Sequence, residues 1–113
     1  MRKIIAFTLT VLAAGILAAT AFAGTKTVKM GDNWFVKSSG VSTVTINKGS
    51  KVKWINVGDA PHDIKVTNGP VKFSSPTVLS GRSFTRTFNK GGTYRVFCDI
   101  HGSSDQRMTL KVQ

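Results

Sequence analysis

The sequence contains few of the residues that form disulfides or ligate transition metals. Its 113 residues include one cysteine and two histidines, and all five acidic residues are aspartates. A single cysteine excludes a disulfide within the chain and leaves an intermolecular bridge, a free thiol or a metal ligand. Two histidines and one cysteine also exclude an enzyme with several metal centres. The length excludes a second domain.

A targeting segment occupies the start of the chain. Met1-Arg2-Lys3 is basic, residues 4–20 carry no charge, and Ala21-Phe22-Ala23 places small residues where a signal peptidase reads them. This pattern predicts a signal peptide over residues 1–23, with cleavage after Ala23 and no membrane insertion afterwards. The alternative is an uncleaved anchor, since the apolar run is nearly long enough to span a bilayer. We expect export to the periplasm or the extracellular side of the cell envelope.

The charge of the remaining domain, residues 24–113, is strongly positive. Without Arg2 and Lys3, fourteen basic side chains face five aspartates, which leaves a net charge of +9. Such a surface favours encounter with an acidic partner. The same charge allows a metal-free domain that adheres to anionic wall polymers or nucleic acid. That alternative leaves the cysteine and both histidines without a role, so we expect no nucleic-acid partner.

The spacing of apolar residues predicts strands. Short alternating runs rich in β-branched and aromatic residues are separated by Gly, Pro and Asn, and no window shows a helical period. The expected strands cover residues 25–30, 41–46, 51–56, 62–67, 83–88, 93–98 and 106–112. This pattern predicts an all-β fold, a Greek-key antiparallel β-sandwich of about seven to eight strands. Trp34, Phe35 and residues 71–79 have no clear place, and the last are expected to form an irregular connection.

Strand parity indicates which side chains face the core. In the run 93–98, the apolar pair Tyr94 and Val96 shares a face with Cys98, so the cysteine should end its strand pointing inward. In the run 106–112, Gln106 shares the inward face with Met108, and a polar residue there needs a reason. Phe97 lies on the face opposite Cys98, either exposed or buried under the 71–79 connection.

Aromatic side chains should fill much of the small core. We expect Trp54, Phe84 and Phe88 to be core residues, because aromatics carry much of the burial in a small domain. The hydroxyl of Tyr94 should close a corner between strands.

The cysteine and both histidines lie where predicted strands meet loops. Cys98-Asp99-Ile100-His101 forms a C-x-x-H motif, and His62 follows Pro61, which stiffens the approach to it. Two imidazoles and one thiolate make a trigonal ligand set that, with a weak axial ligand, is typical of blue-copper electron-transfer sites.

The order of these residues resembles the cupredoxins of the plastocyanin and pseudoazurin type. The supporting segments are residues 49–56 before Pro61-His62, and residues 92–97 before Cys98. The resemblance covers residues 24–113. It implies one type 1 copper ion per chain and a monomeric one-electron carrier, not an enzyme, that serves a redox partner protein with an acidic docking surface. It also implies His62, Cys98 and His101 as ligands, with His101 at the solvent-facing edge.

The axial position departs from the plastocyanin pattern. In that type the axial Met lies five residues after the loop histidine, and five residues after His101 is Gln106. The stellacyanin-like phytocyanins resemble this chain in having an axial Gln followed by a basic residue, as Arg107 is here. The resemblance therefore implies Gln106 as the fourth ligand. Met108 as the axial ligand, or a site with three ligands, stays open.

A second departure follows the first histidine. Related proteins commonly carry an Asn there that bridges the two ligand loops, whereas this chain has Asp63. A carboxylate cannot donate the bonds of an amide. Asp99 follows Cys98, so two carboxylates could lie close together and alter a pKa or weaken the connection between the loops.

A different functional class is a copper carrier or buffer of the envelope. Such proteins tend to use open surfaces rich in Met and His for Cu(I). Only Met30 and Met108 remain after residue 23, which favours electron transfer.

Overall fold

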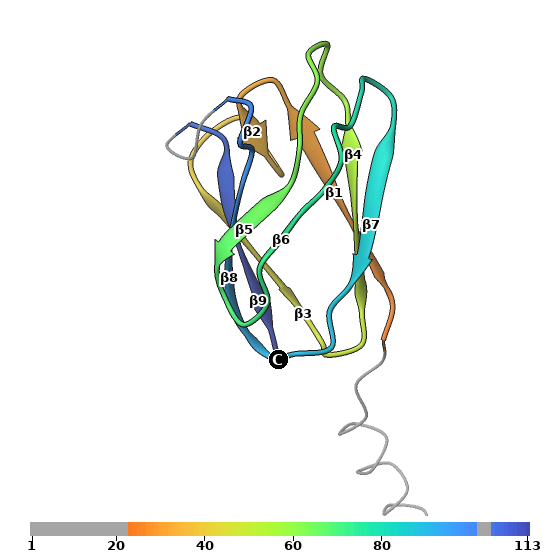
Figure 1. Ribbon diagram of the computed structural model, residues 1–113, viewed down its shortest axis with the longest axis vertical. Coiled ribbons are helices and arrows are strands. Elements are labelled where there is room, and N and C mark those ends of the chain that lie inside the picture. Colours follow the sequence, from red (N-terminus) through yellow and green to blue (C-terminus); the bar gives the residue numbers. More distant parts are fainter. Residues whose placement is uncertain (1–22, 102–104) are drawn as a thin grey trace, which may run out of the picture.

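A computed structural model describes residues 23–101 and 105–113, and these residues form two packed β-sheets (Figure 1). Apart from Ala23, the predicted signal peptide lies outside the described residues. Within them, no helix is long and apolar enough to cross a membrane. The strands are β1 (Thr25–Gly31), β2 (Trp34–Phe35), β3 (Ser42–Ile46), β4 (Lys51–Asn56), β5 (Lys65–Asn68), β6 (Phe73–Ser74), β7 (Ser83–Thr87), β8 (Gly92–Phe97) and β9 (Arg107–Val112).

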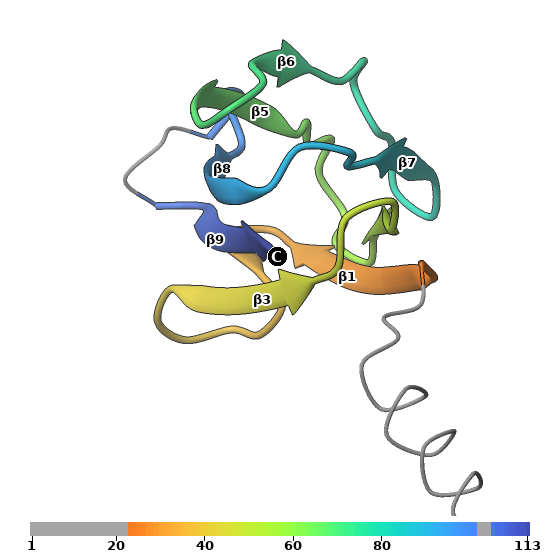
Figure 2. The ribbon, with the colours of Figure 1, turned by 90° about the horizontal axis from the view of Figure 1, so that it is seen from below.

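The two sheets confirm the all-β sandwich and correct one detail of it. One sheet has the order β2-β1-β4-β7 and the other β3-β9-β8-β5-β6, and Figure 2 shows them from below. The expected pairing was antiparallel throughout, but β1 pairs with β4 and β3 pairs with β9 in parallel. The alternation of side chains indicates which face of a strand is buried, but not whether the neighbouring strand runs parallel or antiparallel. Long connections between the paired strands permit parallel pairing.

The strand boundaries differ from expectation where the pattern was weakest. Two elements, β2 and β6, have two residues each. The run at 62–67 becomes a strand only from Lys65, and His62 instead forms an isolated bridge with Val78 through N–H···O bonds of 3.1 and 2.7 Å. The 71–79 connection therefore contributes to holding His62.

The core confirms the parity of the last two long strands. Tyr94, Val96 and Cys98 are all buried, and so are Gln106 and Met108. Trp54 stacks on the half-buried Phe84 and meets Phe88 edge-on. The Tyr94 hydroxyl donates to the carbonyl of Lys90 at 2.8 Å and closes a corner as expected. Phe97 is half-buried on the outer face.

The turn between β1 and β2 depends on glycine. Gly31 pairs with Trp34, and a Cβ added to Gly31 would overlap the indole ring. We therefore expect Gly31→Ala to lower the free energy of unfolding of the apoprotein by about 1–3 kcal/mol, measured by urea denaturation. The matched control is Gly24→Ala, where an added Cβ meets nothing within 4 Å. Equal effects of the two substitutions would contradict this close packing.

Candidate metal centre

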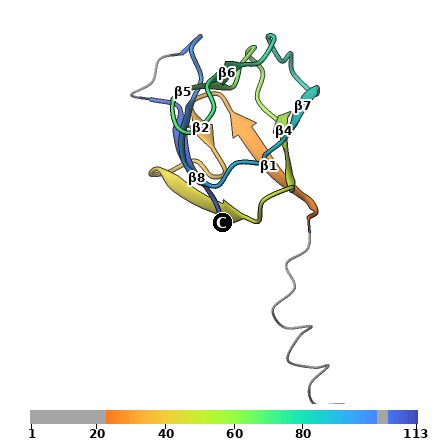
Figure 3. The same ribbon diagram turned by 60° about the horizontal axis from the view of Figure 1, so that its bottom comes forward.

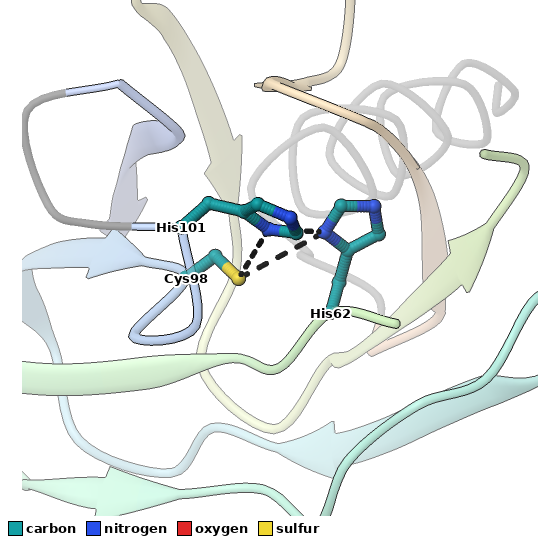
Figure 4. Close-up of side chains that lie close together, drawn as sticks. All are labelled: His62, Cys98 and His101. Carbon is teal, nitrogen blue, oxygen red and sulfur yellow. Dashed lines mark hydrogen bonds between the residues drawn. The ribbon is translucent and has the colours of Figure 1, made fainter. Parts of the chain in front are cut away.

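Loops at one end of the sandwich bring the three expected planar ligands together (Figure 4). His62 lies between β4 and β5, Cys98 directly follows β8, and His101 lies three residues further on. The Cys98 Sγ lies 3.8 Å from Nδ1 of His62 and 3.6 Å from Nδ1 of His101. The two Nδ1 atoms are 3.1 Å apart.

Burial differs among these three residues. His62 and Cys98 are fully buried, whereas His101 is half-buried. One ligand atom from each residue lies within 4.8 Å of the others, which is a spacing that could hold a metal ion. The site therefore has a closed inner side and one histidine toward solvent.

The thiol of Cys98 lies in an apolar environment that also offers N–H donors. Burial raises the pKa of the Cys98 thiol, and backbone N–H groups, first that of Asp63, oppose this shift. The Asp63 N–H lies 3.4 Å from Sγ. This donor is placed to stabilise negative charge on the sulfur.

Asp63 connects the two ligand loops, as an acceptor and not as a donor. Its Oδ1 accepts the N–H of Asp99 at 2.7 Å. The Asp99 carboxylate lies 3.5 Å from Nζ of Lys65, so a cation stands beside it. Asp63 therefore joins the loop of His62 to the loop of Cys98 without donating a hydrogen bond from its side chain.

Gln106 is hydrogen-bonded to Cys98 through the backbone, and its side-chain amide makes hydrogen bonds through its nitrogen. Its backbone carbonyl accepts the N–H of Cys98 at 3.0 Å. Its side-chain Nε2 donates to the carbonyls of Gly31 at 2.7 Å and Trp34 at 3.1 Å. Its Oε1 is buried and has no hydrogen-bond partner among residues 23–101 and 105–113. Met108 is buried within β9, opposite Val96.

Sequence reasoning missed two residues that support the site. The buried Asn56 amide donates to the carbonyls of Ala60 at 2.8 Å and Val78 at 2.9 Å, and its Oδ1 accepts the N–H of Gly58 at 2.9 Å. Asp32 in the β1–β2 turn lies 3.0 Å from Nε2 of His62. The polar pair Asp32-Asn33 after the alternating strand β1 was the available signal, but it indicates only a turn.

The donor set suits copper better than a hard cation. Two imidazole nitrogens and one sulfur are the planar ligands of blue-copper sites, and a weak axial oxygen is compatible with them. The buried Oε1 of Gln106 without a partner fits that axial role, because buried acceptors are normally satisfied.

Comparison with known proteins also supports copper as the metal. The sequence matches the family described as copper binding proteins, plastocyanin/azurin family, over residues 26–113. Plastocyanin of Scenedesmus fuscus is 31% identical over 96 residues, which span 77% of this chain and 98% of that protein.

Solved structures share the sandwich. An oxidized amicyanin variant superposes with a TM-score of 0.66 at 22% sequence identity. The superposition covers 85% of this chain and 88% of the amicyanin chain, which shows that the two share a fold. A copper-containing nitrite reductase from Thermus scotoductus gives a TM-score of 0.67 at 26% identity over 79% of this chain. This chain spans only 22% of that enzyme. By its sequence match and its fold, the chain belongs to the plastocyanin/azurin family of copper-binding proteins, the cupredoxins.

Proposed function

We propose that this protein is an exported one-electron carrier with one copper ion per chain. The observation that carries the proposal is the convergence of Cys98 Sγ with the Nδ1 atoms of His62 and His101 (Figure 4). These three atoms would hold the metal, and Oε1 of Gln106 would be a fourth and weaker donor. Copper bound there would supply a Cu(II)/Cu(I) couple.

The residues around the cluster favour electron transfer because they hold the ligands in fixed positions. His62 is anchored by its bridge to Val78, and the loop before it by the three bonds of Asn56. Asp63 fastens the Cys98 loop to the His62 loop. A ligand set held in this way should move little when the metal changes oxidation state.

The described residues give less support to a carrier or buffer of copper. Both methionines after residue 23, Met30 and Met108, are buried in the core and offer no open surface for Cu(I). We also propose that the protein is not an enzyme. Within residues 23–101 and 105–113 the one candidate metal cluster is His62, Cys98 and His101, and a reductase or oxidase would need further ligands.

Export and a monomeric state belong to the same proposal. The signal pattern over residues 1–23 supports export, with cleavage after Ala23. Cleavage there would leave Gly24 beside β4, where its carbonyl accepts the N–H of Lys51 at 2.7 Å. Mass spectrometry of the protein recovered from the periplasm or medium would test the cleavage site.

The decisive test is the optical and EPR spectrum of the copper-loaded domain. A type 1 site should give an intense visible charge-transfer band and a small copper hyperfine splitting. Repeated oxidation and reduction without loss of metal would separate a carrier of electrons from a carrier of copper. A colourless Cu(II) protein, or one that releases copper on reduction, would contradict the proposal.

The surface charge supports an acidic docking surface on the redox partner. All five aspartate carboxylates lie in turns and loops outside the strands, at Asp32, Asp59, Asp63, Asp99 and Asp105. Many cations lie instead on strands, including Lys29, Lys51, Lys53, Arg95 and Lys111. Attraction to an acidic partner would therefore come mainly from the strand faces.

We expect the association rate with the redox partner to fall by about tenfold or more between ionic strengths of about 0.01 and 0.15 M, measured by stopped flow. Screening of opposite charges is the physical reason. Lys51→Gln should weaken this salt dependence. Thr87→Gln, at the position paired with Lys51 on β7, should leave it unchanged. A rate that is flat with salt would count against an acidic partner.

A further inference from the structure

We propose that Asp32 is a positioning residue that fixes the ring of His62 for metal binding and stabilises the oxidised state by its charge. This inference rests on the proposed copper site. It starts from the 3.0 Å contact between Asp32 Oδ1 and His62 Nε2, on the side of the ring that faces away from Cys98. Asp32 comes from the β1–β2 turn, far from His62 in the sequence.

The Asp32 carboxylate is itself held in place. Its oxygens accept the N–H of Asp59 at 3.0 and 3.2 Å and the N–H of Ala60 at 3.1 Å. A Cβ added to Gly58 would collide with the same carboxylate, so glycine permits this close approach. An aspartate is ionised at neutral pH, and an ionised carboxylate only accepts hydrogen bonds, which matches the N–H donors that surround Asp32.

An acceptor-only partner selects one tautomer of the neutral imidazole. The proton must lie on Nε2 to be donated to Asp32, and Nδ1 then carries a free lone pair. That lone pair lies on the side of Cys98 Sγ, 3.8 Å away, and of His101 Nδ1, 3.1 Å away. The contact thus prepares the ring for a metal ion before any metal arrives.

The same turn also orients the fourth proposed ligand. The carbonyls of Gly31 and Trp34, on either side of Asp32 and Asn33, accept both bonds that the Gln106 amide nitrogen makes. The amide oxygen accepts no hydrogen bond from the described part of the chain. One turn, residues 31–34, supports ligands that come from two different loops.

The charge of Asp32 should also act on the metal. A carboxylate bonded to a ligating imidazole increases the basicity of that ligand, and negative charge near the site favours Cu(II) over Cu(I). Asp32→Asn retains an oxygen acceptor and removes the charge, whereas Asp32→Ala removes both. Comparison of the two separates the effect of charge from that of positioning.

The experiment uses the mature protein with three variants, Asp32→Asn, Asp32→Ala and the control Asp59→Asn. The control removes a charge from an exposed residue of the neighbouring β4–β5 loop, which carries His62. Nitrogen NMR of the metal-free protein reports the His62 tautomer, and titration and voltammetry of the copper protein report affinity and potential. We expect Asp32→Ala to populate both tautomers and to weaken Cu(II) binding about 10–100-fold. We expect Asp32→Asn to raise the potential more than Asp59→Asn does.

The outcomes distinguish this inference from the proposed function. A wild-type metal-free protein with its His62 proton on Nδ1 would overturn the positioning role, whether or not copper binds. Equal potentials for Asp32→Asn and Asp59→Asn would overturn the role of the charge. If the wild-type protein binds no copper, the proposed function fails, whereas the tautomer measurement still tests the contact.

Discussion

Cys98→Ser is expected to abolish the intense visible band of the Cu(II) protein and to increase its copper hyperfine splitting. The band requires charge transfer from a thiolate, and Cys98 supplies the one sulfur placed 3.6–3.8 Å from both imidazole nitrogens. A serine hydroxyl is a harder and weaker donor that stays protonated at neutral pH. The optical and EPR spectra of the copper-loaded variant measure the effect.

The same substitution should leave the fold in place. Serine is slightly smaller than cysteine and can accept the Asp63 N–H that now points at the sulfur. Burying its hydroxyl should cost about 1–3 kcal/mol in the unfolding of the apoprotein. Circular dichroism and urea denaturation provide the control. A variant that keeps the blue band would show that Cys98 is not the ligand responsible for it.

Gln106→Met is expected to raise the reduction potential and to make the EPR signal more axial. The Gln106 amide oxygen is buried and has no partner in the part of the chain that the structure describes. As a hard donor it should stabilise Cu(II) relative to Cu(I). A thioether in its place favours Cu(I). The variant also leaves the carbonyls of Gly31 and Trp34 without their donor, which should cost about 1–3 kcal/mol in stability.

The matched control for the axial position is Met108→Leu. Met108 is 1% exposed, within β9, and its replacement by leucine nearly conserves volume. We expect a cost of about 1 kcal/mol and no change in the spectra. The reverse result, a large spectral change for Met108→Leu and none for Gln106→Met, would assign the axial position to Met108.

The sequence predicted much of the fold because alternating residues report burial directly. The strands that carry Trp54, Tyr94 and Leu110 were found with the correct face inward. Strand direction could not be obtained in the same way, since a period of two is common to parallel and antiparallel pairs. The two-residue strands β2 and β6 are too short to show any period.

The sequence revealed those residues of the candidate site whose types are rare in this chain. One cysteine and two histidines drew attention at once, whereas Asp32 is one of five aspartates and Asn56 one of several polar residues at strand ends. The contact of Asp32 with His62 follows from the parallel pairing of β1 with β4. The register aligns Met30 with Asn56 near the ends of the two strands. The β1–β2 turn, with Asp32, and the β4–β5 loop, with His62, therefore begin at the same edge of the sheet. Antiparallel pairing of these strands would place the two connections at opposite edges of the sheet, so it does not predict the contact.

The position of β9 has a consequence for how the protein folds. This last strand lies between β3 and β8 inside the five-stranded sheet (Figure 2), and the C-terminus that follows it lies next to the yellow strand β3 (Figure 3). It pairs Met108 with Ser42, which is far away in the sequence. Sheets closed by such distant pairs fold slowly, in about milliseconds to seconds. A chain that is still being synthesised lacks this strand and cannot complete its core. Gln106 directly precedes β9, so its amide can reach the carbonyls of Gly31 and Trp34 only after this last strand has docked.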